Sequence, residues 1–76
     1  MTKDKILIDL LTIKARGGGA KDVKEYIMNL MNSLSGGDIV QKHRRAAGAI
    51  IAYGSYERGL FDEELLAEML ERIINH

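Results

Sequence analysis

The stretch from Asp38 to Arg58 most constrains the fold, because no helix-ending signal interrupts it and strong signals stand on both sides. Asp38 is a natural N-cap, since its carboxylate can accept hydrogen bonds from the backbone N–H groups of the first turn. Gln41 stands where it completes a capping box, and Gly59 supplies the left-handed residue that commonly follows a helix. The chain contains no proline, so this segment predicts one helix about 30 Å long.

A strip of small residues runs along one side of this predicted helix. Gly48, Ala52 and Ser55 recur at helical spacing, which allows a second helix to approach closely. A glycine inside a helix costs about 1 kcal/mol relative to alanine, so a kink or break at Gly48 or Gly54 is the alternative. The strip, together with the apolar stripe of the last helix, predicts a helix-packing or dimer interface. Its residues are Gly48, Ile51, Ala52, Ser55, Leu66, Met69, Leu70 and Ile73.

Three shorter segments also carry apolar residues at helical spacing. The first ends at a glycine triplet, the second begins with a capping box at Asp22 and Glu25, and the last begins after the N-cap residue Asp62. No segment alternates apolar and polar residues as a strand does. The sequence therefore predicts an all-α fold: one small four-helix domain over residues 1–76, with a long third helix and a helical dimer as its expected assembly. The expected helices span about 3–16, 22–35, 38–58 and 62–75.

Apolar side chains are abundant for a single small core. Hydrophobic residues make up 46% of the 76 residues. A domain of this size buries only about 60% of the surface of its unfolded chain. Since large exposed apolar patches usually mark binding sites, we expect either a homodimer or a groove for another protein.

The composition also limits the compartment and the chemistry. The absence of cysteine excludes disulfides, thiol catalysis and cysteine-ligated zinc. The apolar run near the start is interrupted by Asp9 and Lys14, unlike that of a signal peptide. No segment reaches the roughly 20 apolar residues that span a bilayer. We therefore expect a cytoplasmic protein with no membrane partner, no cofactor and no small-molecule substrate.

Charges of opposite sign lie in opposite halves of the chain. Residues 1–45 carry nine basic and five acidic side chains, a net charge of +4, and residues 46–76 carry two basic and six acidic ones, a net charge of −4. This asymmetry favours an oppositely charged partner, or else neutralisation of the two halves within the fold. The candidate residues for binding a partner or nucleic acid are Gln41, Lys42, His43, Arg44, Arg45, Lys21 and Lys24.

Catalytic and metal sites have little support in the sequence. Glu64, Glu68 and Glu71 share a helical face, but acid–base catalysis needs two groups in different environments. His43 and His76 lack the spacing and companion ligands of a zinc site. The glycine triplet of the first connection lacks the spacing and the preceding strand of a phosphate-binding loop. We therefore expect that the protein is not an enzyme.

The pattern as a whole favours a small regulatory protein that acts by protein–protein binding. Its target would be a bacterial, phage or plasmid macromolecule such as a repressor, polymerase, replication factor or toxin, which it would modulate or inhibit. The alternative is a helix-turn-helix-like DNA-binding transcriptional regulator, because a short glycine-containing turn precedes a helix whose first turns carry Lys42, Arg44 and Arg45. Two features oppose this alternative: the net charge is zero, and the second half of that helix is apolar.

Overall fold

The computed structural model describes residues 1–75 and contains four helices, with no strand among those residues. The helices are α1 (Lys3–Ala15), α2 (Ala20–Ser33), α3 (Ile39–Glu57) and α4 (Glu63–Ile74). The prediction of an all-α, four-helix fold with a long third helix is confirmed. The radius of gyration of the Cα atoms is 11.7 Å, close to the value of about 11 Å expected for a compact chain of this length. His76, which was considered above as a metal ligand, lies outside the described residues.

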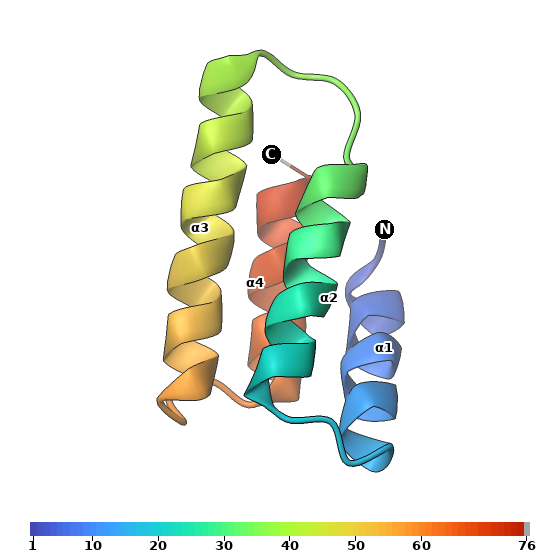
Figure 1. Ribbon diagram of the computed structural model, residues 1–76. Coiled ribbons are helices and arrows are strands. Elements are labelled where there is room, and N and C mark those ends of the chain that lie inside the picture. Colours follow the sequence, from blue (N-terminus) through green and yellow to red (C-terminus); the bar gives the residue numbers. More distant parts are fainter. Residues whose placement is uncertain (76) are drawn as a thin grey trace.

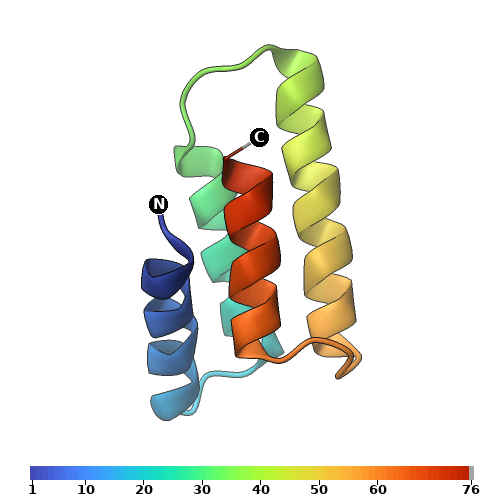
Figure 2. The same ribbon diagram turned by 180° about the vertical axis from the view of Figure 1, so that it is seen from behind.

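The helices form an up-and-down bundle in which each helix runs opposite to the one before it (Figure 1). α1 packs against α2 and α4, and α3 packs against the same two helices. α1 and α3 therefore lie at opposite corners, and Figure 2 shows α4 between them. Short connections favour this antiparallel order. As a consequence, the start of α2 and the start of α3 lie at opposite ends of the bundle.

Local capping interactions define where α3 and α4 begin. Asp38 Oδ1 accepts a hydrogen bond from the Gln41 N–H at 2.9 Å, and Gln41 Oε1 accepts one from the Asp38 N–H at 3.1 Å. Asp62 Oδ1 accepts one from the Leu65 N–H at 2.8 Å. Gly59 has a φ of 79° after the end of α3. These contacts confirm the predicted capping box, N-cap and left-handed glycine, and α3 continues without a break through both of its interior glycines.

The second helix begins and ends two residues earlier than its expected bounds of about 22–35. α2 begins three residues after the start of the glycine triplet, with Gly19 as its N-cap, and ends at Ser33. Asp22 is the third residue of the helix rather than its first cap, and its Oδ2 accepts a hydrogen bond from the Gly19 N–H at 3.0 Å. A carboxylate at this position reaches back to the cap residue. The aspartate was therefore correctly identified as part of the helix start but placed in the wrong role.

The core is made of large residues from three helices and small residues from α3. The buried hydrophobic residues are Ile6, Leu10, Val23, Ile27, Leu30, Ala49, Ala52, Leu66, Ala67 and Leu70. Of these, α3 supplies only the two alanines. A Cβ atom added at Gly48 would lie 3.2 Å from Ile73 Cδ1, so the small inward residues of α3 let α4 approach closely. The large aliphatic residues of α3 must therefore lie elsewhere.

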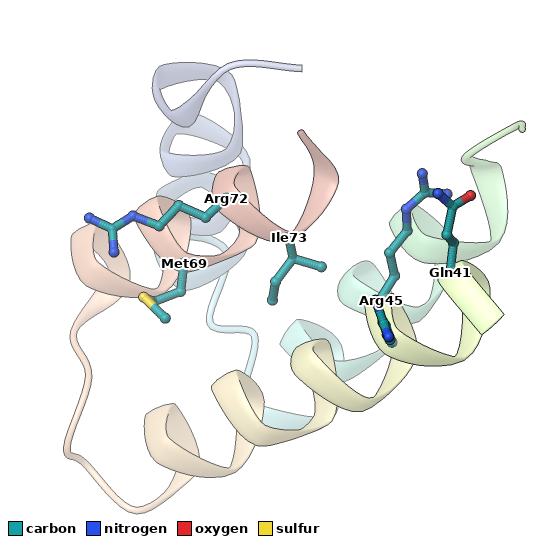
Figure 3. A pocket seen from close by; sticks show the side chains of 6 residues that line it. Gln41, Arg45, Met69, Arg72 and Ile73 are labelled. Carbon is teal, nitrogen blue, oxygen red and sulfur yellow. The ribbon is translucent and has the colours of Figure 1, made fainter. Parts of the chain in front are cut away.

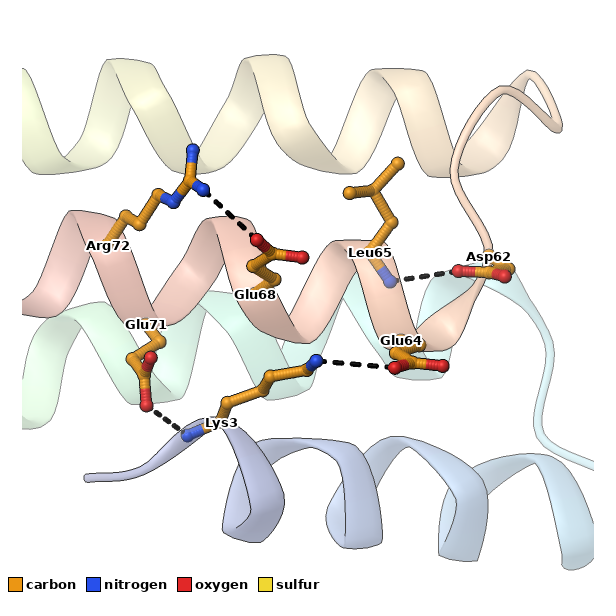
Figure 4. Close-up of polar contacts among 7 residues, drawn as sticks. All are labelled: Lys3, Asp62, Glu64, Leu65, Glu68, Glu71 and Arg72. Carbon is orange, nitrogen blue, oxygen red and sulfur yellow. Dashed lines mark hydrogen bonds and ion pairs between the residues drawn. The ribbon is translucent and has the colours of Figure 1, made fainter.

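Polar contacts close the seam between α1 and α4 (Figure 4). Lys3 Nζ lies 3.3 Å from Glu64 Oε1, and Lys14 Nζ lies 3.0 Å from Glu63 Oε1. The backbone N–H of Lys3 also donates to Glu71 Oε2. These contacts join the basic first half of the chain to its acidic second half. Part of the charge segregation is thus neutralised within the fold.

Candidate partner-binding surface

Large hydrophobic side chains remain exposed after the bundle has closed. They are Met1, Ile8, Leu11, Met28, Ile39, Val40, Ile50, Ile51, Leu60 and Leu65. Six of these are more than half exposed, and four of the six, Ile39, Val40, Ile50 and Ile51, belong to α3. Single exposed hydrophobic residues are normal on a protein surface, whereas a concentration of them marks an interaction site. The outward side of α3 is therefore the main candidate surface.

Helical geometry explains why α3 exposes so much apolar surface. Ile50 and Ile51 lie between Ala49 and Ala52, which are both buried, so the helical period directs the two isoleucines outward to different sides. Ile50 lines a hollow together with residues of α2. Ile51 follows Gly48 by three residues and therefore lies on the side of α3 that packs against α4. Two separate surfaces result, one on each flank of α3.

The first surface is a groove between α2 and α3, called the α2–α3 groove below. It consists of two adjoining hollows of about 390 and 310 Å³, and Met28 lines both of them. Its apolar lining consists of Ile27, Met28, Met31, Leu34, Ile50 and Tyr53. Methionine side chains are unbranched and flexible, which suits a surface that must adapt to a partner.

Charged residues stand at both ends of the α2–α3 groove. Lys24 lies at one end, with its Nζ 6.0 Å from the centroid of the Tyr53 ring, and Lys42 and Arg45 lie at the other end, beside His43. Among residues 1–75, Glu57 is the only one that contributes a carboxylate to the lining of the groove, and its Oε2 accepts a hydrogen bond from the Tyr53 hydroxyl at 2.7 Å. This hydrogen bond raises the pKa of the Tyr53 hydroxyl. The groove thus has an apolar floor, and the basic side chains at its ends outnumber its carboxylate.

The structure divides the predicted partner-binding residues into two groups. One group lies on the first turns of α3 and consists of Gln41, Lys42, His43, Arg44 and Arg45, of which all but Arg45 are exposed. The other consists of Lys21 and Lys24, which are exposed at the start of α2. Because α2 and α3 run antiparallel, the two groups stand at opposite ends of the bundle (Figure 1). They do not form one continuous basic patch, although members of both line the α2–α3 groove.

Gln41 and Arg45 are partly engaged within the fold. The Gln41 amide oxygen completes the α3 cap, and Arg45 Nη1 donates to the Gly36 carbonyl at 3.4 Å. Arg45 Nε is buried and has no hydrogen-bond partner among residues 1–75. Figure 3 shows both side chains on α3, across from residues of α4 that line the same hollow of about 320 Å³. Lys42 and Arg44 are consequently freer to meet a partner than these two residues.

The second surface spans the outer sides of α3 and α4 and is called the α3–α4 face below. Its apolar middle consists of Ile51 and Met69, beside the Arg72–Glu68 ion pair of 3.0 Å. Its basic end carries Arg44, beside the hollow drawn in Figure 3. Its acidic end carries Asp62 and Glu64, around a second hollow of about 300 Å³ that Leu60 and Leu65 also line. This face therefore has opposite charges at its two ends.

Most of the predicted helix-packing or dimer-interface residues are used inside the chain. Those that pack within the bundle are Gly48, Ala52, Leu66, Leu70 and Ile73. Ser55 is half-buried. Ile51 is 69% exposed, and Met69 is half-buried beside it on the α3–α4 face. The small-residue strip thus brings α4 against α3, and only two residues of the predicted set remain to contact another molecule.

Several residues of both surfaces were absent from the predicted set, namely Ile50, Tyr53, Leu60 and Leu65. A signal for Ile50 was present in the sequence. When alanines occupy the buried positions on either side of a pair of large residues in a helix, the large side chains must point outward. Leu60 and Leu65 stand on either side of the α4 N-cap, and no sequence pattern distinguishes them from core leucines.

Other kinds of site find no support in the described part of the chain. Residues 1–75 contain no group of three or more His, Cys, Asp or Glu side chains that could hold a metal ion. Among the same residues, no helix combines the length and the apolar character that crossing a membrane requires. Comparisons with models of protein families, with curated proteins and with solved structures found no match. The arguments for function therefore rest on the α2–α3 groove and the α3–α4 face.

Proposed function

We propose that the protein is a small non-enzymatic regulator that binds an acidic, amphipathic segment of another protein in the α2–α3 groove. The observation that carries this proposal is the position of Ile50, which is 59% exposed at the edge of a groove with an apolar floor and basic ends. A groove of this kind accommodates the apolar face of a helix, whose anchor residues recur at helical spacing. Binding would modulate or inhibit the macromolecule to which the segment belongs.

The charges of the groove favour a partner of negative charge. Lys24 at one end and Lys42 at the other would face the polar flanks of a bound helix. Like charges placed across an interface are costly, so these cations favour a helix with acidic flanks. Glu57 stands at the Lys24 end. We therefore expect the partner's carboxylates to gather toward the Lys42 end of the groove.

The compartment proposed for this activity is the cytoplasm. The chain contains no cysteine, which is the usual composition where thiols are kept reduced.

The experiment compares three baits in an extract of the organism of origin: the unaltered protein, Ile50→Glu and the matched control Ile8→Glu. Both isoleucines are 59% exposed, but Ile8 lies on α1, at the opposite corner of the bundle. Proteins retained by the unaltered protein and by Ile8→Glu, but lost with Ile50→Glu, are the expected partners. Their contact segments, mapped by cross-linking, should be acidic and amphipathic. If the two variants retain the same proteins, the groove does not bind the partner.

DNA binding remains the second candidate because Lys42, His43 and Arg44 are exposed on the first turns of α3 and form no ion pair among residues 1–75. However, α2 and α3 lie side by side and antiparallel (Figure 1), whereas the two helices of a helix-turn-helix cross steeply. Nuclease treatment of the same extract separates the two candidates. A bound fraction that disappears with nuclease and weakens steeply with salt would favour DNA binding over protein binding.

A further inference from the structure

We infer that the α3–α4 face is the interface of a homodimer, in which it pairs with the same face of a second, antiparallel copy. This face lies on the opposite flank of α3 from the α2–α3 groove. The inference therefore adds a second interaction to the proposed function, and either of the two can fail while the other holds.

The exposed apolar residues of the face supply a reason to associate. Ile51 is 69% exposed and Leu60 is 68% exposed, whereas Leu65 and Met69 are partly covered beside them. A stable interface buries about 800 Å² on each partner, roughly a sixth of the 5002 Å² that the chain exposes.

The charged ends identify the partner as a second copy. Arg44 stands at one end of the face, Asp62 and Glu64 stand at the other, and the Arg72–Glu68 ion pair lies between them. Arg58 lies near the acidic end, but the carboxylates there remain in excess. A surface that is basic at one end and acidic at the other is complementary to itself after a half turn. Such isologous pairing is the commonest form of closed dimer.

The same charges select the direction in which the copies run. A two-fold axis perpendicular to the helices places the basic end of each copy against the acidic end of the other. A two-fold axis parallel to the helices would place arginine against arginine and carboxylate against carboxylate, which is unfavourable. The dimer is therefore antiparallel.

The helix register locates the two-fold axis. Gly48 of α3 touches Ile73 of α4, and the two helices are antiparallel (Figure 1). Ile51 is three residues further along α3, so it lies level with the neighbourhood of Met69 on α4. These two side chains occupy the middle of the face, midway between its charged ends. The axis passes between them, and the Ile51 side chains of the two copies lie close together.

Existing ion pairs on this face do not prevent the exchange of partners. Arg72 pairs with Glu68 at 3.0 Å, and Glu64 pairs with Lys3 at 3.3 Å (Figure 4). Both pairs are solvent-exposed, and exposed pairs contribute little to stability. Burial against a second copy would bring further opposite charges to the same side chains.

The first test measures the dimer dissociation constant of the full chain by sedimentation equilibrium. We expect a reversible dimer, weakened about thirty-fold or more by Ile51→Glu, as for a central anchor residue. Ile8→Glu, the matched surface control, should leave the constant unchanged, and circular dichroism should show that both variants remain helical. A chain that stays monomeric at every concentration, or an Ile51→Glu variant that dimerises normally, would overturn the inference.

The second test determines direction with single cysteines, which is straightforward because the chain has none of its own. Under mild oxidation, Ile51→Cys should form a disulfide-linked dimer readily, because its position lies near the axis. Arg44→Cys should not link to itself, because the antiparallel arrangement places the two copies of residue 44 far apart. Efficient self-linking of Arg44→Cys would contradict the antiparallel dimer.

The two proposals can be separated with one pair of variants. Ile50→Glu should lose the extract partner and remain dimeric, whereas Ile51→Glu should lose the dimer. If Ile50→Glu also dissociates the dimer, the two surfaces are not independent and the assignment of the α3–α4 face to self-association is wrong.

Discussion

The seam between α1 and α4 and the outward side of α3 are built by different rules. Across the seam, Lys14 pairs with Glu63 and Lys3 pairs with Glu64. On the outward side of α3, the most prominent side chains are aliphatic, and among residues 1–75 no ion pair joins α3 to another helix. The polar contacts of the seam suit a surface exposed to water. The exposed aliphatic residues of α3 instead resemble one half of an interface.

The difference follows from which residues α3 and α4 turn inward. α4 fills the core with Leu66 and Leu70, which leaves carboxylates for its outer positions. α3 fills its inner positions with alanine and glycine, so that α4 can approach, and its isoleucines are displaced outward. Close packing of one helix pair thus produces apolar surface on the other side of the same helix.

The largest expected effect is the difference in unfolding free energy between truncating a buried aliphatic side chain and truncating an exposed one. Leu70 has no exposed surface, so Leu70→Ala should lower the free energy of unfolding by about 2–5 kcal/mol. Ile51→Ala should change it by no more than about 0.5 kcal/mol when the protein is dilute enough to be monomeric. Urea unfolding followed by circular dichroism measures both. If Ile51→Ala costs as much as Leu70→Ala, then Ile51 is not an outward residue and the comparison fails.

An intermediate effect is expected at the polar contact between α1 and α2. The Tyr26 hydroxyl donates to Asp9 Oδ2 at 2.8 Å, and Lys5 Nζ donates to Asp9 Oδ1 at 2.7 Å. The Lys5 hydrogen bond, with a contribution from Tyr26, lowers the pKa of Asp9, whereas burial and the bond to Asp9 raise the pKa of Tyr26. Tyr26→Phe should cost about 1 kcal/mol of unfolding free energy at neutral pH.

The signs of the two pKa shifts predict how this contact depends on pH. The lowered pKa of Asp9 gives stability that is present above its unfolded pKa of about 3.9 and is lost as the pH falls through the folded value. The raised pKa of Tyr26 gives stability that is present below its unfolded pKa of about 10 and is lost as the pH rises through the folded value. Tyr26→Phe should reduce the alkaline loss, leaving the part that comes from the raised pKa values of Tyr53 and Tyr56, and it should reduce the acid loss. An unchanged alkaline profile in urea unfolding would show that the hydroxyl does not stabilise the bundle.

Local chemistry explains how much of this fold was predictable. Asp38, Gln41 and Asp62 act within one helical turn, so their positions in the sequence were enough to locate the starts of α3 and α4. Asp22 also acts locally, but an aspartate suits both the first cap position and the third helical position. The sequence alone could not choose between these roles.

The two candidate surfaces were less predictable because they depend on how helices pack. The separation of Lys21 from the first turn of α3 follows from the antiparallel order, and no local signal reports it. The opposite directions of Ile50 and Ile51 depend on which neighbours α3 contacts on each side. The excess of apolar surface could be recognised in the composition, but its division into the α2–α3 groove and the α3–α4 face could not.

The smallest expected effect is the difference in unfolding free energy between replacing two glycines of α3 by alanine. Within the described part of the chain, no atom outside the local helix lies within 4 Å of a Cβ added at Gly54, whereas one added at Gly48 would lie 3.2 Å from Ile73 Cδ1. Gly54→Ala should therefore raise the unfolding free energy by about 0.5–1 kcal/mol, the usual gain from replacing a helix-interior glycine. Gly48→Ala should gain less, because Ile73 must move. Removing Cδ1 with Ile73→Val should recover part of the missing gain, so urea unfolding of the single and double variants should show favourable coupling. Equal gains at both glycines, without coupling to residue 73, would mean that close packing of α4 does not require small residues on the inner side of α3. The proposed reason why the isoleucines of α3 point outward would then be wrong.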